Sequence, residues 1–199
     1  KSFLSNLKKK KIWVASSTHP GEEKMIGKAH LHLRNNFKNL LTIIIPRHID
    51  RTKEICDELK LLNLKTVIRS SKQKIVNDTD IYLVDSYGET KKFFKIAKTI
   101  FMGGSIANHG GQNPIEPARY NLNIVHGPNI GNFKDIFGLF NRKKLAFKIK
   151  NQNQLNNIVQ KLLNKKTKKN LDLKKIGESI LKKSVIEINK ILNNEIKKT

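Results

Sequence analysis

Short, uniformly apolar runs recur along the chain and constrain the fold more than any other feature. The segments between most of them have helical character, as in DRTKEICDELKLLN (residues 50–63), where Ile55, Leu59 and Leu62 share one side. Strands that are apolar throughout, rather than in alternation, are those of parallel sheets buried on both faces. The sequence therefore predicts an α/β fold, a Rossmann-like parallel sheet with helices on both faces. The predicted strands are residues 12–17, 39–46, 65–71, 80–85, 98–104, 122–127 and 145–150.

The length of 199 residues suits one domain of generous size. We interpret residues 1–11, KSFLSNLKKKK, as a linker and residues 12–199 as one nucleotide-binding domain. Its C-terminal part, about residues 151–199, has a helical pattern with a break expected near Asn170. No run approaches the ~18 apolar residues that cross a membrane. The single Cys56 cannot form a disulfide within the chain and suits a reducing compartment.

The charge is strongly basic, with 40 Lys and Arg against 16 Asp and Glu and a formal net charge of +24. Such a charge suggests nucleic acid as a partner. However, only six of the 40 basic residues are Arg, the better reader of phosphates and bases, and the charge is spread along the chain. Three interpretations stay open: a solvated lysine surface set by an AT-rich coding bias, attraction to an anionic membrane, and nucleic-acid binding.

Polar loops that contain Gly or Pro follow five of the predicted strands. In open parallel sheets, ligands bind at the carboxyl ends of the strands. The loops therefore predict a binding edge. They are SSTHPGEE, PRH, DSYGE, GGSIANHGGQNPIEP and HGPNIGN.

The stretch GGSIANHGGQNPIEPA, residues 103–118, is the most unusual of these loops. Its glycines would let the backbone come close to a ligand. Pro114 suits the first turn of a helix, where the free N–H groups of Ile115 and Glu116 would favour a phosphate. Glu116 could accept hydrogen bonds from the two hydroxyls of a sugar diol, or it could be a simple helix-start charge.

Two other loops carry candidate contacts. Arg47 follows a buried strand, and its planar guanidinium suits a phosphate, although it could be an ordinary surface arginine. Gly88 and Glu89 begin a predicted helix, where backbone N–H groups could read a base edge or the residues could only cap the helix.

The loop after the first strand offers Ser17, Thr18 and His19, with a helix N-cap as the alternative role. His30 and His32 lie two apart in a predicted helix, so they do not share a face, and no metal site is expected. The chain has neither G-x-G-x-x-G after its first strand nor G-x-x-x-x-G-K-[ST] anywhere. These absences argue against a nicotinamide enzyme and a P-loop NTPase.

Taken together, ASSTHPGEE, IIIPRHIDR, DSYGE, FMGGS and GGQNPIEPA resemble, in order and spacing, the C-terminal half of the Kdo transferases. These enzymes move 3-deoxy-D-manno-oct-2-ulosonic acid (Kdo) from its CMP ester to lipid A precursors. The resemblance covers about residues 12–150. It implies the C-terminal half of a GT-B glycosyltransferase, a fold in which two Rossmann-like domains face a cleft and the second binds the nucleotide donor.

The resemblance also implies which residues contact CMP-Kdo. DSYGET stands where the family usually has DTMGEL, PRHIDR where it has PRHPER, and GGQNPIEPA where it has GGHNPLEPA. No metal and no other cofactor is implied. Possible secondary contacts are Ser17, Thr18, His19, Gly104 and Ser105. The implied contacts are Pro46, Arg47, Tyr87, Gly88, Glu89, Asn113, Pro114, Ile115 and Glu116.

In this family the general-base glutamate and the membrane anchor belong to the N-terminal domain. The resemblance therefore implies no catalytic residue in this chain, which alone is expected to be soluble and inactive. The implied partners are CMP-Kdo, a lipid A precursor, the N-terminal GT-B domain and an anionic membrane surface, with no specific nucleic acid. The implied location of the full protein is the cytoplasmic face of the inner membrane. The alternatives are another GT-B-like nucleotide-sugar enzyme, of epimerase type, and a nucleotide-binding module without chemistry.

Overall fold

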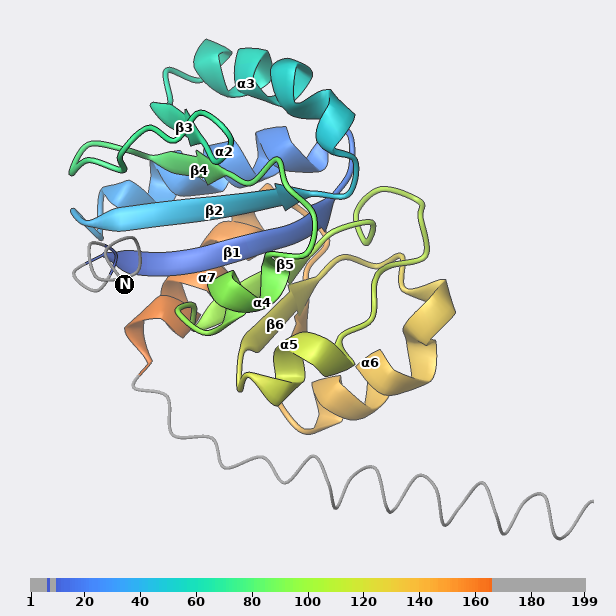
Figure 1. Ribbon diagram of the computed structural model, residues 1–199. Helices are drawn as coiled ribbons and strands as arrows, with labels where there is room; N and C mark the ends of the chain where they lie inside the picture. The colour runs from blue at the N-terminus through green and yellow to red at the C-terminus, as the bar shows by residue number, and fades with distance from the viewer. Residues whose placement is uncertain (1–6, 8–9, 166–199) are drawn as a thin grey trace, which may run out of the picture. The chain divides into compact units, whose positions relative to one another are not determined.

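Seven parallel strands form one sheet in the order β3-β4-β2-β1-β5-β6-β7 (Figure 1). All six neighbouring pairs are parallel, so the predicted parallel α/β sheet is confirmed. The computed structural model describes residue 7 and residues 10–165. The strands are β1 (Lys11–Thr18), β2 (Leu40–Pro46), β3 (Thr66–Ile68), β4 (Ile81–Leu83), β5 (Thr99–Met102), β6 (Asn123–His126) and β7 (Ala146–Lys148).

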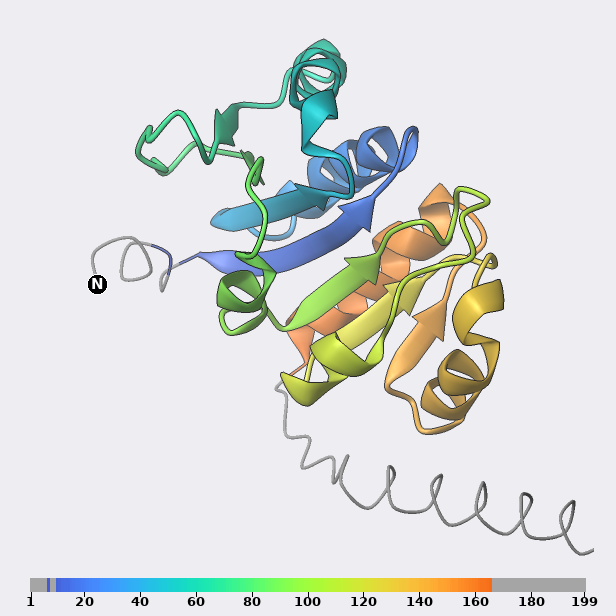
Figure 2. The same cartoon turned by 45° about the vertical axis from the view of Figure 1, so that its right-hand side comes forward.

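Helices cover both faces of the sheet, as Figure 1 and the turned view in Figure 2 show. The right-handed crossovers of a parallel sheet place helices on one face when the chain moves toward β3 and on the other when it moves toward β7. The first face carries α2 (Glu22–Arg34), α3 (Thr52–Leu61) and α7 (Gln152–Asn164). The second carries α4 (Thr90–Phe94), α5 (Ile115–Arg119) and α6 (Lys134–Arg142). Short 3₁₀ turns, η1 (Ile49–Arg51) and η2 (Gly131–Phe133), precede α3 and α6.

The core lies between the central strands and the first helical face. Every residue of β2 is buried, which explains why its sequence LLTIIIP shows no polar alternation. Helix α2 contributes Ile26 and Leu33 to the same core, and α7 contributes Leu155 and Val159. Their spacing of four or seven residues puts the apolar side chains of each helix on one face.

The direction in which successive strands are added to the sheet reverses between β1 and β5. These strands are neighbours, but β1 leads into α2 on one face and β5 leads into α5 on the other. Their connections therefore leave the sheet edge in opposite directions. This is the topological switch point, where folds of this class bind ligands.

Several elements are shorter than the sequence predicted, although each predicted strand of the described part is present. The strand expected at 65–71 ends at Ile68, and the helix expected to have Pro114 in its first turn spans only Ile115–Arg119. Strand β1 begins at Lys11, which is the last residue of the predicted linker and one residue before the predicted strand. The predicted helical break at Asn170 lies outside the described residues, so the domain boundary at residue 199 stays a prediction. In the described part, no helix is both long and apolar enough to span a bilayer.

Candidate functional site

The end of β1 is locked against its two neighbouring strands. The backbone N–H of Arg47 donates to the carbonyl of Thr18 at 3.0 Å, and that of Gly103 donates to Ser16 at 2.8 Å. A Cβ atom on Gly103 would lie 2.1 Å from the carbonyl oxygen of Ser17, so only glycine fits there. Gly103 therefore lets the protein's own backbone approach, and the expectation that this glycine makes room for a ligand is wrong.

Glu22, in the first turn of α2, anchors the loop after β5. Its carboxylate is buried and accepts hydrogen bonds from five backbone N–H groups. Oε2 accepts from His19 and Gly104 at 3.0 and 2.8 Å. Oε1 accepts from residues 105, 106 and 107 at 3.1, 2.9 and 3.2 Å. Successive N–H groups of this kind form an anion-binding concavity, which an internal carboxylate fills here.

This arrangement shows what Gly104 and Ser105 bind within the domain, while their contact with substrate stays a prediction. Their N–H groups are committed to Glu22 rather than free for substrate, and the Ser105 hydroxyl accepts from the N–H of Gly127 at 2.8 Å. The sequence shows Glu22 and Glu23 only as two consecutive acids in the loop SSTHPGEE, and this pair is the one available signal. Glu23 is also buried, and it pairs with Arg51 at 2.9 Å.

Three histidines gather at the carboxyl ends of β1 and β2 and in the loop after β5. The ring of His19 stacks on that of His109, with centroids 4.0 Å apart, and meets the edge of His48 at 5.9 Å. His19 is only 6% exposed. Burial, helped by the nearby charges of His109, His48 and Arg47, lowers the pKa of His19 to about 4. The His19 ring is therefore neutral at pH 7.

Pro46 and Arg47 lie where the sequence predicted, at the carboxyl end of β2. Pro46 is buried as the last residue of the strand, and Arg47 is exposed beside His48. The Arg47 backbone is fixed by the hydrogen bond that its N–H donates to Thr18, while the residue is exposed. This combination suits recognition of an anionic group by a guanidinium.

The loop DSYGE is held by an arginine that the sequence reasoning missed. Arg69 donates two hydrogen bonds to Glu89, at 2.9 and 3.2 Å, and Ser86 and Lys92 donate to the same carboxylate at 2.7 and 2.6 Å. These donors hold the pKa of the Glu89 carboxyl well below its usual range. Arg69 gave no separate sequence signal, because it lies inside the strand predicted at 65–71, which ends at Ile68 in the structure.

The held loop presents backbone and one aromatic ring to the surface. Gly88 has φ +79°, a left-handed conformation that glycine adopts without strain. Tyr87 is 68% exposed. Because the Glu89 carboxylate is committed to Arg69, the groups left for a ligand are the loop's N–H groups and the Tyr87 ring.

The start of α5 differs from the expectation. The side chain of Asn113 accepts from the N–H of Ile115 at 2.9 Å, so this N–H is not free for a phosphate. Pro114 is the buried residue before the helix, and the helix has only five residues. Glu116 is about half exposed and lies 3.6 Å from the ammonium of Lys91. That contact brings the start of α5 beside the start of α4 and leaves the carboxylate accessible.

The structure thus gathers several of the predicted residues into two groups. Thr18, His19 and Arg47 meet at the ends of β1 and β2. Glu116 meets Lys91, next to the loop of Glu89. Among the described residues, no group of three or more His, Cys, Asp or Glu side chains is arranged to hold a metal.

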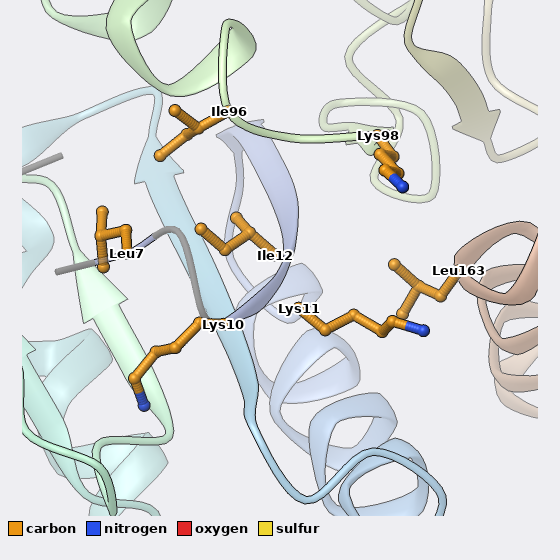
Figure 3. A pocket seen from close by; sticks show the side chains of 7 residues that line it. All are labelled: Leu7, Lys10, Lys11, Ile12, Ile96, Lys98 and Leu163. Carbon is orange, nitrogen blue, oxygen red and sulfur yellow. The ribbon is translucent and has the colours of Figure 1, made fainter. Parts of the chain in front are cut away.

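A separate cavity of about 340 Å³ lies at the opposite, amino-terminal end of the strands (Figure 3). None of the sequence-predicted site residues is among the described residues that line it. It is bordered by Leu7, Lys10, Lys11, Ile12, Ile96, Lys98 and Leu163.

A parallel sheet with helices on both faces and polar loops after its strands is a Rossmann-like α/β domain, a class that binds ligands at the carboxyl ends of its strands. Comparison with solved structures finds the C-terminal CMP-Kdo binding domain of WaaA from Acinetobacter baumannii, with a TM-score of 0.75 and 32% identity. The match covers 79% of this chain and 82% of that one. The chain belongs to the Kdo transferase family, and its fold is that of the C-terminal domain of a GT-B glycosyltransferase.

Curated relatives agree with this placement. The chain is 34% identical to the 3-deoxy-D-manno-octulosonic acid transferase of Haemophilus influenzae over 156 residues, which is 78% of this chain and 36% of that protein. It is 34% identical to the enzyme of Rickettsia prowazekii over 180 residues, which is 90% of this chain and 38% of that protein. The chain therefore spans a little over a third of the length of these relatives. No family model matches it.

Proposed function

We propose that this chain binds CMP-Kdo as the donor domain of a Kdo transferase that adds Kdo to a lipid A precursor. The observation that carries the proposal is the match to a CMP-Kdo binding domain over most of both chains, combined with candidate contacts at the same sheet edge. The acceptor is the finer part of the proposal and rests on the resemblance alone.

Each of the three candidate contacts binds a different part of CMP. Arg47, exposed at the end of β2, pairs with the phosphate through its guanidinium. The loop of Tyr87 to Glu89 offers N–H groups and an exposed ring to the base, and Arg69 keeps that loop in place. The carboxylate of Glu116 accepts hydrogen bonds from the ribose hydroxyls, in competition with Lys91.

The chain's own residues in this proposal bind and orient the donor. No step of the transfer is assigned to them, because the resemblance places the general base in the N-terminal domain. The cytoplasmic membrane face and the anionic membrane surface belong to the same proposal. The many lysines would support the membrane contact, since each Lys near an anionic surface contributes about 1 kcal/mol.

Isothermal titration of the chain with CMP, with and without EDTA, tests the proposal at the level of binding. We expect saturable binding that EDTA does not change, because an arginine and backbone groups recognise the phosphate. Binding that disappears with EDTA would contradict metal-free recognition. No heat of binding at millimolar CMP would contradict the proposed donor site.

A further inference from the structure

Two consecutive residues at the end of β1 each carry a buried polar atom without a partner. Within the described part of the chain, Thr18 Oγ1 and His19 Nε2 have no hydrogen-bond partner. Thr18 is fully buried and His19 is 6% exposed. A buried donor or acceptor left unpaired is costly, so an adjacent pair of them calls for an explanation.

Their place in the fold suggests a ligand. They lie at the carboxyl end of β1, beside β5, at the point where the chain's connections diverge to opposite faces. The residue before them, Ser17, has φ +56°, a conformation that is uncommon outside glycine. Strained backbone of this kind clusters at ligand-binding and active sites.

The charges around His19 favour an anion. Burial lowers the pKa of His19 most, and the charges of His109, His48, Arg47 and Arg51 add to it, although Arg51 is itself paired with Glu23 and Glu54. The nearest carboxylate, Glu22, is taken up by five backbone N–H groups, so its charge is already solvated by the protein. An added anionic oxygen would meet donors and positive charge here.

We propose that the Thr18 hydroxyl and the His19 ring bind the carboxylate of the acidic sugar in the donor. The inference rests on the proposed function, because Kdo is an acid. The nucleotide contacts occupy the β2, β4 and α5 loops, and the β1–β5 crevice beside them receives the sugar. A His19 tautomer with the proton on Nε2 donates one hydrogen bond, and the Thr18 hydroxyl donates the other.

His109 is the side chain that must yield. It is exposed and covers the His19 ring through a stacked contact at 4.0 Å. The edge of the His19 ring also faces Gly104, where a Cβ atom would lie 3.3 Å from Nε2 and 3.4 Å from the Cβ atom of His109. Turning the exposed His109 ring aside is therefore the route by which the anion reaches Nε2.

The test compares CMP, which lacks the acidic sugar, with freshly prepared CMP-Kdo, which adds that sugar and its carboxylate. Both are titrated into the wild-type chain and into Thr18→Val and His19→Phe. Thr66→Val is the matched control, because Thr66 Oγ1 is also buried without a partner but lies on β3. His32→Phe controls for the ring change, since His32 lies on α2 and contacts Gln160.

We expect Thr18→Val and His19→Phe each to weaken CMP-Kdo about tenfold or more, with CMP affinity changed less than twofold. His19→Gln restores part of the loss, because its amide can donate near the position of Nε2. The two controls leave both ligands unchanged. Thermal melting of every variant checks the fold, and Thr18→Val should melt no lower than wild type, because it removes an unpaired buried hydroxyl.

Three results would overturn the inference. An equal loss for CMP and CMP-Kdo would assign the two residues to the phosphate. Wild-type affinity for both ligands in Thr18→Val and His19→Phe would show a structural role only. Wild-type chain that binds CMP but binds CMP-Kdo no more tightly would exclude a carboxylate subsite, whereas failure to bind either ligand refutes the proposed function and this inference with it.

Discussion

Replacing Glu22 by Gln should destabilise the domain strongly, although the two side chains have nearly the same shape. The carboxylate holds five backbone N–H groups, two on Oε2 and three on Oε1. The amide of Gln keeps one oxygen and presents an NH₂ group where the other oxygen was. In either orientation of the amide, at least two of the five backbone N–H groups then face the NH₂ group of Gln and lose their acceptor.

The magnitude follows from the unpaired groups. A buried donor without a partner costs about 1–3 kcal/mol, so two of them cost about 2–6 kcal/mol. That is a large part of the roughly 5–15 kcal/mol by which domains are stable. The loss should be greatest in the segment 104–107, which contains four of the five donors.

Urea unfolding at pH 7, followed by circular dichroism, measures the effect. Glu58→Gln is the control, because Glu58 is a half-buried acid on α3 that is outside this network, and its replacement should change stability by no more than about 0.5 kcal/mol. If Glu22→Gln costs less than 1 kcal/mol (a threshold set by the lower bound for one unpaired donor), the five hydrogen bonds do not anchor the loop.

Three other measurements test the role of Glu116, the protonation of His19 and the effect of the basic charge. Glu116→Gln should weaken CMP about tenfold and dCMP less, because dCMP lacks one of the ribose hydroxyls; calorimetry showing equal losses would mean that Glu116 does not read the 2′-hydroxyl. The free energy of unfolding should fall as the pH drops from about 6.5 to about 4, because the unfolded chain takes up a proton on His19 in that window and the folded chain does not. Denaturant titrations should find this slope shallower in His19→Gln, and an unchanged slope would assign it to other groups. The +24 charge should give salt-sensitive binding to anionic vesicles but only weak DNA binding that disappears by physiological salt; a tight, selective DNA complex in a filter-binding assay at that salt would contradict the donor-domain account.

The strands could be predicted because the apolar composition of each one reflects its burial in the sheet. LLTIIIP is apolar except for Thr42, and all seven of its residues are buried in the sheet. The loops after the strands were likewise visible as Gly- and Pro-bearing polar segments, and the parallel topology brings them to one edge. The order of those strands and the side-to-side contacts of their loops depend on tertiary pairing and could not be read from local pattern.

The site's supporting contacts were missed for the same reason. Glu22 and Ala107 are 85 residues apart, and Arg69 and Glu89 are 20 apart, so no periodicity links them. Gly103 suggested a ligand because a glycine permits any close approach, and only the fold shows that the approaching group is the backbone of Ser17. The N–H of Ile115 suggested a phosphate because the sequence does not show that Asn113 caps it.

The central claim is that CMP binds at the carboxyl edge of the sheet. Amide chemical-shift mapping by NMR during a CMP titration tests it most directly. The account predicts the largest shifts at Arg47, Gly88, Glu89 and Glu116. Shifts confined to the opposite end of the strands, around Lys10 to Ile12 at the cavity in Figure 3, would contradict it, as would a titration that shifts no resonance at all.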